Sequence, residues 1–178
     1  RGLVEPSATP AEQEAAAAAL LALTGGAGGA AAAVKAGALP PLVRLLSTDS
    51  VKAGWGCPAD EAMAVLRNLA ESDDTVRAVA AEPGVVGATV STLQRALSGP
   101  GGAESAAAAL ACLAVAGKRA EIVREGGVEA LSAVLQGGSA AAKTQAVRAL
   151  SSLAEDEASH AALAESALGP LVELAGGD

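Results

Sequence analysis

Aromatic side chains are almost absent from this sequence of 178 residues. It contains no Phe, no Tyr and a single Trp. Aromatic and β-branched residues favour strands, and Val is the only residue of these classes that is common here. Ala, the strongest helix former, supplies about a quarter of the residues. The composition therefore predicts an all-α protein whose core is built from Ala, Leu and Val.

Cysteine and positive charge are also in short supply. The two cysteines, Cys57 and Cys112, lie far apart without metal-type spacing, which excludes a disulfide framework and favours a reducing, intracellular compartment. The net charge of −8 argues against nucleic acid or an anionic membrane surface as the main partner. Gly, Pro or charged residues interrupt every apolar run before the roughly 18–20 residues of a membrane span. We expect no nucleic acid and no membrane among the partners.

Sequence patterns for catalysis or nucleotide binding are incomplete. Gly137–Thr144 matches the phosphate-binding loop pattern except that Ala142 replaces the second Gly, and the preceding segment has a helical register where that loop requires a strand. Gly26–Ala31 satisfies only a loose dinucleotide pattern. His160, the only histidine, has no nucleophile at a recognisable spacing, so we expect it on the surface near a helix junction. The sequence predicts no enzyme activity, no cofactor, no metal and no small-molecule substrate.

Two segments recur along the chain in alternation, which is the signature of a repeat protein. The first recurs with spacings of 47, 42 and 40 residues at Leu39, Val86, Val128 and Leu168. The second, here called the leucine segment, is Leu20–Thr24, Leu66–Ala70, Leu110–Ala114 and Leu150–Ala154. Its second leucines, Leu23, Leu69, Leu113 and Leu153, are spaced by 46, 44 and 40 residues. Two segments that keep the same period predict repeated units of about forty residues.

Each unit is expected to hold three helices. The first is short, at 74–82 or 117–125, and ends before a Gly, which suits a helix C-terminus. The second carries an apolar stripe such as Leu39, Leu42, Leu45 and Leu46. The third carries apolar residues at helical spacing, such as Met63, Leu66 and Leu69. Carboxylates at Asp73–Asp74 and Glu155–Glu157 fall at helix starts, where we expect them to cap free amides.

The segments Ala36–Leu46 (AGALPPLVRLL) and Ala64–Ala70 (AVLRNLA) resemble the armadillo repeat, and the resemblance covers about residues 11–176. It implies a right-handed α-solenoid of three-helix repeats, so that 1–178 forms one solenoid segment. The implied units are a partial repeat at 11–24, full repeats at about 30–71, 74–116 and 117–154, and a truncated repeat at 155–176. Because both ends fall inside a repeat, and Arg1–Pro6 holds neither an initiator Met nor a signal peptide, we expect a longer parent chain.

The resemblance also implies that the third helices line a concave groove. Peptide-binding members of the family place a Trp and, four residues later, an Asn there in successive repeats. In this sequence the Asn position is occupied by Ala22, Asn68, Cys112 and Ser152, and the Trp position by Ala18, Ala64, Ala108 and Arg148. The peptide-binding ladder is therefore mostly missing. We predict a groove of small side chains that binds an extended peptide or a helix of another protein. Asn68 and Arg148 would make the polar contacts, and Ala64, Ala108, Cys112 and Ser152 would line the groove.

An insertion of about five residues falls at Asp49–Pro58 and contains the only Trp, Trp55. In one interpretation Trp55 covers a nearby apolar patch from a long surface loop. In the other it anchors a partner protein, since aromatic residues dominate the energy of many interfaces.

The leading functional hypothesis is a non-catalytic scaffold or adaptor that binds other proteins. The resemblance leaves two alternatives open. The first is a substrate-recruiting region of a larger ubiquitin-ligase-type protein, because many plant armadillo arrays follow a U-box. The second is a structural spacer in a large assembly. The expected location is the cytoplasm, with a cytoskeletal or ciliary assembly or the nucleus as alternatives.

Overall fold

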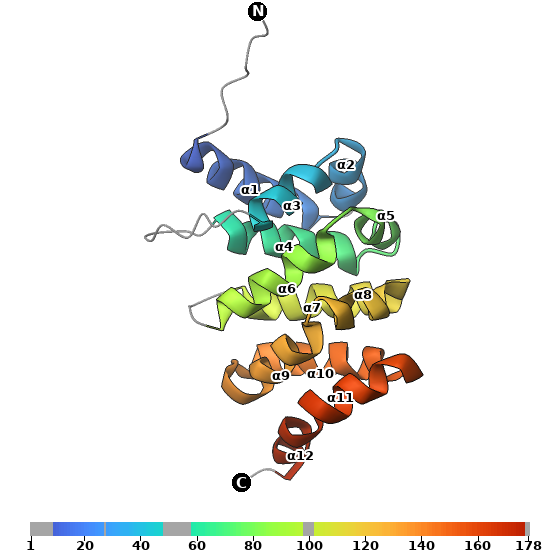
Figure 1. Cartoon of the computed structure of the whole chain (residues 1–178). Coiled ribbons are helices and arrows are strands. Elements are labelled where there is room, and N and C mark those ends of the chain that lie inside the picture. The colour runs from blue at the N-terminus through green and yellow to red at the C-terminus, as the bar shows by residue number, and fades with distance from the viewer. Residues whose placement is uncertain (1–8, 27, 48–57, 98–101, 177–178) are drawn as a thin grey trace, which may run out of the picture.

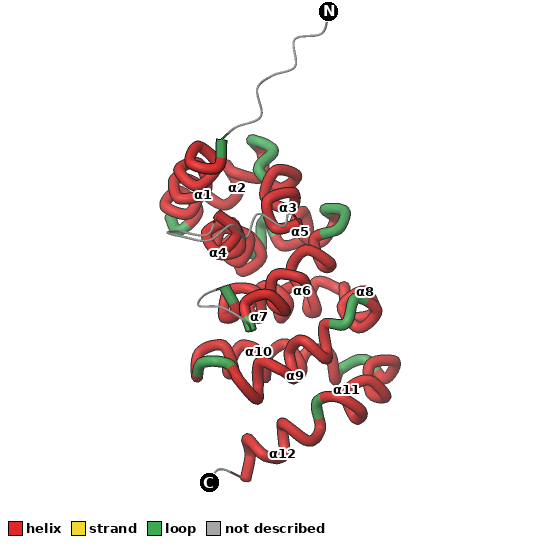
Figure 2. Tube along the Cα trace, turned by 60° about the vertical axis from the view of Figure 1, so that its left-hand side comes forward, coloured by secondary structure: helices red, strands yellow, loops and turns green. Residues whose placement is uncertain are grey.

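The computed structural model describes residues 9–26, 28–47, 58–97 and 102–176, and these residues form helices joined by short connections, without a strand (Figures 1 and 2). The predicted all-α class is confirmed. The α-helices are α1 (Pro10–Thr24), α2 (Gly29–Lys35), α3 (Leu39–Ser47), α4 (Pro58–Glu71), α5 (Val76–Ala81), α6 (Val85–Ala96), α7 (Ala103–Leu113), α8 (Arg119–Arg124), α9 (Gly127–Gly137), α10 (Ala140–Ala154), α11 (His160–Ser166) and α12 (Leu168–Gly176).

The helices other than the short α2, α5, α8 and α11 stack in two rows, and the stack runs from α1 at one end to α12 at the other (Figure 1). In the first, called row A, α1 packs on α4, α4 on α7 and α7 on α10. In the second, called row B, α3 packs on α6, α6 on α9 and α9 on α12. The rows pack on each other through α3 with α4, α6 with α7 and α9 with α10. The leucine segments all lie on row A, at or near the C-terminal ends of its helices.

Glycine sets the turn that leads into each of the first three row B helices. Gly37, Gly84 and Gly126 have φ angles of +79°, +75° and +77°, a left-handed conformation that other residues rarely adopt. The expected short helices before these glycines are found as α5 and α8. Between α7 and α8 the helical path is kinked within Ala114–Lys118, where Gly117 has a non-helical φ of +91°.

The capping prediction is correct at one of its two sites. Asp156 accepts a hydrogen bond from the Ala158 amide at 3.3 Å, as expected of a cap. Glu155 instead forms an ion pair with Arg119. The prediction for Asp73–Asp74 is wrong: the N-cap of α5 is Thr75, no side chain caps the helix there, and the Thr75 hydroxyl donates to the Leu69 carbonyl.

Row A is held together by small side chains interleaved with leucines. In α7 the four consecutive residues Ala106–Ala109 are all buried, and so are Leu110 and Leu113. A helix can be buried on so many sides only when its neighbours approach closely, and Ala permits this because its side chain is a single methyl group. Burial of each Leu adds roughly 1.5–3 kcal/mol. The core therefore depends on a few well-placed leucines within a framework of alanines.

Among the described residues, no single helix is long and apolar enough to cross a bilayer. Only α2 and α3 taken together reach that length and composition, and they are bent by 86° at their junction.

We predict that Leu113→Ala lowers the free energy of unfolding by about 2–5 kcal/mol, because the leucine is fully buried between row A helices and its truncation leaves a cavity. Urea denaturation followed by circular dichroism measures the effect. Val115→Ala, at an exposed position two residues further on, is the control and should change stability by no more than about 0.5 kcal/mol. Equal losses for the two variants would contradict the packing described here.

Candidate functional site

Asn68 joins two helices of row A through its side chain. Its Nδ2 lies 3.3 Å from the Thr24 Oγ1 of α1, to which it donates. Its Oδ1 accepts from Arg67 Nη2 at 3.4 Å. An amide side chain has two N–H donors and two acceptor lone pairs, so Asn68 keeps one of each for a partner. The half-buried amide is therefore held in place and still able to bind.

Cys112 lies between charged side chains of the two neighbouring row A helices. Burial of the half-buried thiol raises its pKa, Glu71 of α4 raises it further, and Arg148 of α10 lowers it. Each effect has a simple cause: burial and a nearby carboxylate disfavour the thiolate, whereas a guanidinium stabilises it. Arg148 is exposed, and its Nη1 donates to Gln145 Oε1 at 2.6 Å. Cys112 and Arg148 thus lie near each other, and their place in a groove stays a prediction.

The other predicted lining residues differ in exposure. Ala64 and Ser152 are half-buried, and the Ser152 carbonyl accepts from Arg119 Nε at 2.7 Å. Ala108 is only 1% exposed, so its side chain is not available to a partner and the prediction for this residue is wrong. The buried alanine belongs to the packing of α7 rather than to its surface.

Trp55 and Cys57 lie outside the described residues, and the interpretation of Trp55 as an anchor stays a prediction. His160 is exposed at the start of α11 with its Nε2 2.9 Å from the Ala154 carbonyl oxygen, which confirms its expected place near a helix junction. The segment before Gly138 is α9, a helix, where a phosphate-binding loop would require a strand. No three His, Cys, Asp or Glu side chains within the described ranges lie close enough together to hold a metal ion.

Sequence reasoning missed three residues that lie beside the predicted site residues: the buried Thr24, the half-buried Arg67 and the exposed Glu71. The sequence did set Thr24 apart, because the other three leucine segments end in Ala at the equivalent position. A hydroxyl that replaces a methyl group at the edge of a helix row suggests a polar contact. No sequence pattern sets Glu71 apart, because its approach to Cys112 depends on how α4 and α7 are aligned.

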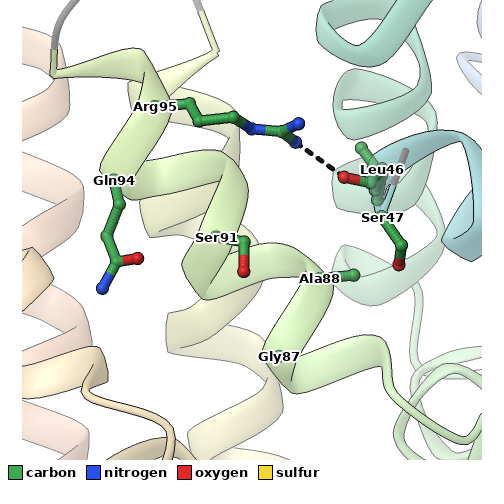
Figure 3. Close-up of a pocket in the computed structure, with 7 residues that line it drawn as sticks. All are labelled: Leu46, Ser47, Gly87, Ala88, Ser91, Gln94 and Arg95. Carbon is green, nitrogen blue, oxygen red and sulfur yellow. Dashed lines mark hydrogen bonds between the residues drawn. The ribbon is translucent and has the colours of Figure 1, made fainter. Parts of the chain in front are cut away.

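A separate pocket of about 490 Å³ lies between α3 and α6 of row B (Figure 3). Its lining residues are Leu46, Ser47, Gly87, Ala88, Ser91, Gln94 and Arg95. Arg95 Nη2 donates to the Leu46 carbonyl at 2.6 Å, which satisfies a free carbonyl at the end of α3. A methyl group at Gly87 would lie 3.3 Å from Oε2 of Glu125, a side chain that does not line the pocket. None of the predicted site residues lines the pocket.

No protein-family model and no curated protein matches this sequence. The fold does match a solved structure, the crystal structure of an engineered protein, target OR366 of the Northeast Structural Genomics Consortium. The two structures have a TM-score of 0.79 and 25% sequence identity. The match covers 97% of this chain and 71% of the engineered one. This chain is therefore an all-helical protein with the architecture of that engineered protein.

We predict that the two charged neighbours control the reactivity of Cys112 in opposite directions. In a Cys57→Ser background, Glu71→Gln should speed alkylation at neutral pH about two- to threefold, because loss of the carboxylate lowers the thiol pKa and the thiolate is the reactive form. Arg148→Gln should slow it by a similar factor. Alkylation rates are measured by mass spectrometry from pH 7 to 10, with Glu104→Gln as the control. A rate that neither substitution changes would show that these side chains are not close to Cys112.

Proposed function

We propose that this chain is a segment of an armadillo-type, right-handed α-solenoid that acts as a non-catalytic scaffold and binds a partner protein along row A. The observation that carries the proposal is a line of polar side chains that crosses all four row A helices. Thr24 of α1 bonds to Asn68 of α4, and Cys112 of α7 lies between Glu71 of α4 and Arg148 of α10. Thr24 is buried and holds Asn68 in place, while Asn68, Cys112 and Arg148 are accessible side chains on α4, α7 and α10. Accessible side chains on successive helices suit an elongated partner.

The solenoid part of the proposal is supported by the order of the helices. Along the chain a short helix is followed by a row B helix and then a row A helix, as in α2–α3–α4, α5–α6–α7 and α8–α9–α10. The second leucine of each leucine segment lies on a successive row A helix, and the other recurring segment falls on successive row B helices. Stacked units of this kind bury their apolar faces only against one another. The engineered protein of similar structure shares the arrangement over almost the whole length of this chain.

The partner chemistry follows from the side chains on row A. Ala18 and Ala22 of α1 are exposed and Ala64 of α4 is half-buried, so the backbone of a partner can approach closely. Asn68 offers an amide donor and acceptor to that backbone, and Arg148 offers a cation to a carboxylate or a carbonyl. An extended peptide or a helix satisfies these groups. We propose such a segment of another protein as the ligand.

The test compares the wild-type chain with the double variant Asn68→Ala, Arg148→Glu in capture of proteins from an extract of the source cells. We expect the double variant to lose the specific partner while keeping its helical circular dichroism, because Arg148 is exposed and Asn68 is only half-buried. The matched control is Ser91→Ala with Arg44→Glu, which makes the same kinds of change at exposed positions of α6 and α3 in row B. It should retain the partner.

Partners retained equally by the wild type and both variants would refute binding along row A and direct attention to the segment around Trp55. If the wild type captures nothing, the structural-spacer alternative is favoured. Partners that are substrates of ubiquitination would favour the ligase-associated alternative over a simple adaptor.

A further inference from the structure

Arg67 of α4 is a half-buried cation without an anion beside it. The described residues contain two other half-buried arginines, and each has a strong acceptor. Arg119 forms an ion pair with Glu155. Arg95 donates to the Leu46 carbonyl at 2.6 Å. Arg67 has neither a carboxylate nor a carbonyl as a partner within the part of the chain that the structure describes, and this sets it apart.

The single hydrogen bond of Arg67 leaves most of its guanidinium unused. Its Nη2 donates to Asn68 Oδ1 at 3.4 Å, which is long for such a bond. Its Nε is buried and has no hydrogen-bond partner among the described residues. Burial of this end of the group strengthens the attraction of a carboxylate to the rest of it, because the local dielectric constant is lower than in water. The planar fork of a guanidinium fits a carboxylate through two parallel hydrogen bonds.

The carboxylates of α4 do not neutralise this charge. Glu71 lies one turn after Arg67 on the same helix, yet the two side chains form no ion pair. A cation followed four residues later by a carboxylate is also the weaker order for a pair on a helix. Asp60 and Glu61 lie seven and six residues before Arg67, about 9–10 Å away along the helix axis. The guanidinium therefore remains able to bind an anion from outside the chain.

The position of Arg67 places it on the surface proposed to bind a partner. It is next to Asn68, and α4 is an inner helix of row A with α1 on one side and α7 on the other. Arg148 lies two helices further along and donates only to Gln145 among the described residues. Neighbouring helices pack about 8–10 Å apart, so about six residues of an extended peptide reach from α4 to α10. One short segment can contact both arginines.

We propose that the partner segment bound along row A is acidic, and that Arg67 selects it through a two-bond ion pair with an Asp or Glu side chain of the partner. Arg148 makes a second, more exposed contact of the same sign, and Asn68 bonds to the backbone of the segment. This proposal rests on the proposed function, because it names the chemistry of the partner at the same surface. The net charge of −8 attracts basic molecules to the chain as a whole, so an acidic partner requires local cations such as these.

The experiment is selection of random peptides of about twelve residues, displayed on phage, by the immobilised chain. The wild type should enrich peptides rich in Asp and Glu. Arg67→Met keeps the length of the side chain without its charge and should lose this enrichment, whereas Arg67→Glu should shift it to Lys and Arg. The matched controls, Arg44→Met and Arg44→Glu at an exposed position of α3 in row B, should select acidic peptides as the wild type does.

A selected acidic peptide with a fluorescent label then gives the size of the effect by fluorescence anisotropy. Arg67→Met should weaken its binding about tenfold or more, the change expected for loss of a hydrogen bond between charged groups. Arg67→Lys should recover part of the affinity, because it keeps the charge but not the fork. Replacing the contacting Glu of the peptide by Gln should weaken binding to the wild type and have little further effect on Arg67→Met. All variants must first show wild-type circular dichroism.

The outcomes separate this proposal from the proposed function. Selected peptides whose binding is weakened by Asn68→Ala, but which show no acidic preference, would overturn the role of Arg67 and leave binding along row A in place. The same conclusion holds if Arg67→Met and Arg67→Glu leave an acidic preference unchanged. A wild-type chain that enriches no peptide, or peptides whose binding no substitution at Arg67, Asn68 or Arg148 changes, would overturn both.

Discussion

The structure depends on the close approach of row A helices through alanine. Ala106–Ala109 can all be buried only because each neighbouring helix comes near enough to cover a single methyl group. Larger side chains at these positions would force the helices apart, since a well-packed core does not absorb extra volume without strain. The leucines at Leu110 and Leu113 fill the remaining space and supply most of the apolar burial. Row B, the turns and the polar surface are all arranged around this spacing.

Most of the fold could be predicted because its signals are local. The period of the leucine segments gives the row A helices, and the glycines at 37, 84 and 126 mark the turns into row B, since a left-handed residue ends a helix wherever it occurs. The caps were less predictable. Asp73 and Asp74 have the right chemistry, but Thr75 occupies the cap position and turns its hydroxyl to a carbonyl of α4. Which of three neighbouring polar residues occupies the cap position depends on where the backbone places the first turn.

The candidate site was predictable only in part, because position in a repeat does not determine exposure. Ala18, Ala64, Ala108 and Arg148 are equivalent in sequence, yet the first and last are exposed, the second is half-buried and the third is buried. Exposure depends on what the adjacent helices place beside each residue. For the same reason Glu71 was missed: its effect on Cys112 requires the alignment of two helices, and no sequence pattern reports it. Residues that act within one helix can be read from the sequence, and those that act between helices need the structure.

The spacing set by alanine also positions the polar side chains along row A. Their line needs the four helices in register, because Thr24, Asn68, Cys112 and Arg148 come one from each helix. A larger side chain among Ala106–Ala109 would push α7 away from its neighbours and would move Cys112 relative to Glu71 and Arg148. The proposed binding of a partner along the row therefore depends on the same packing that holds the core together.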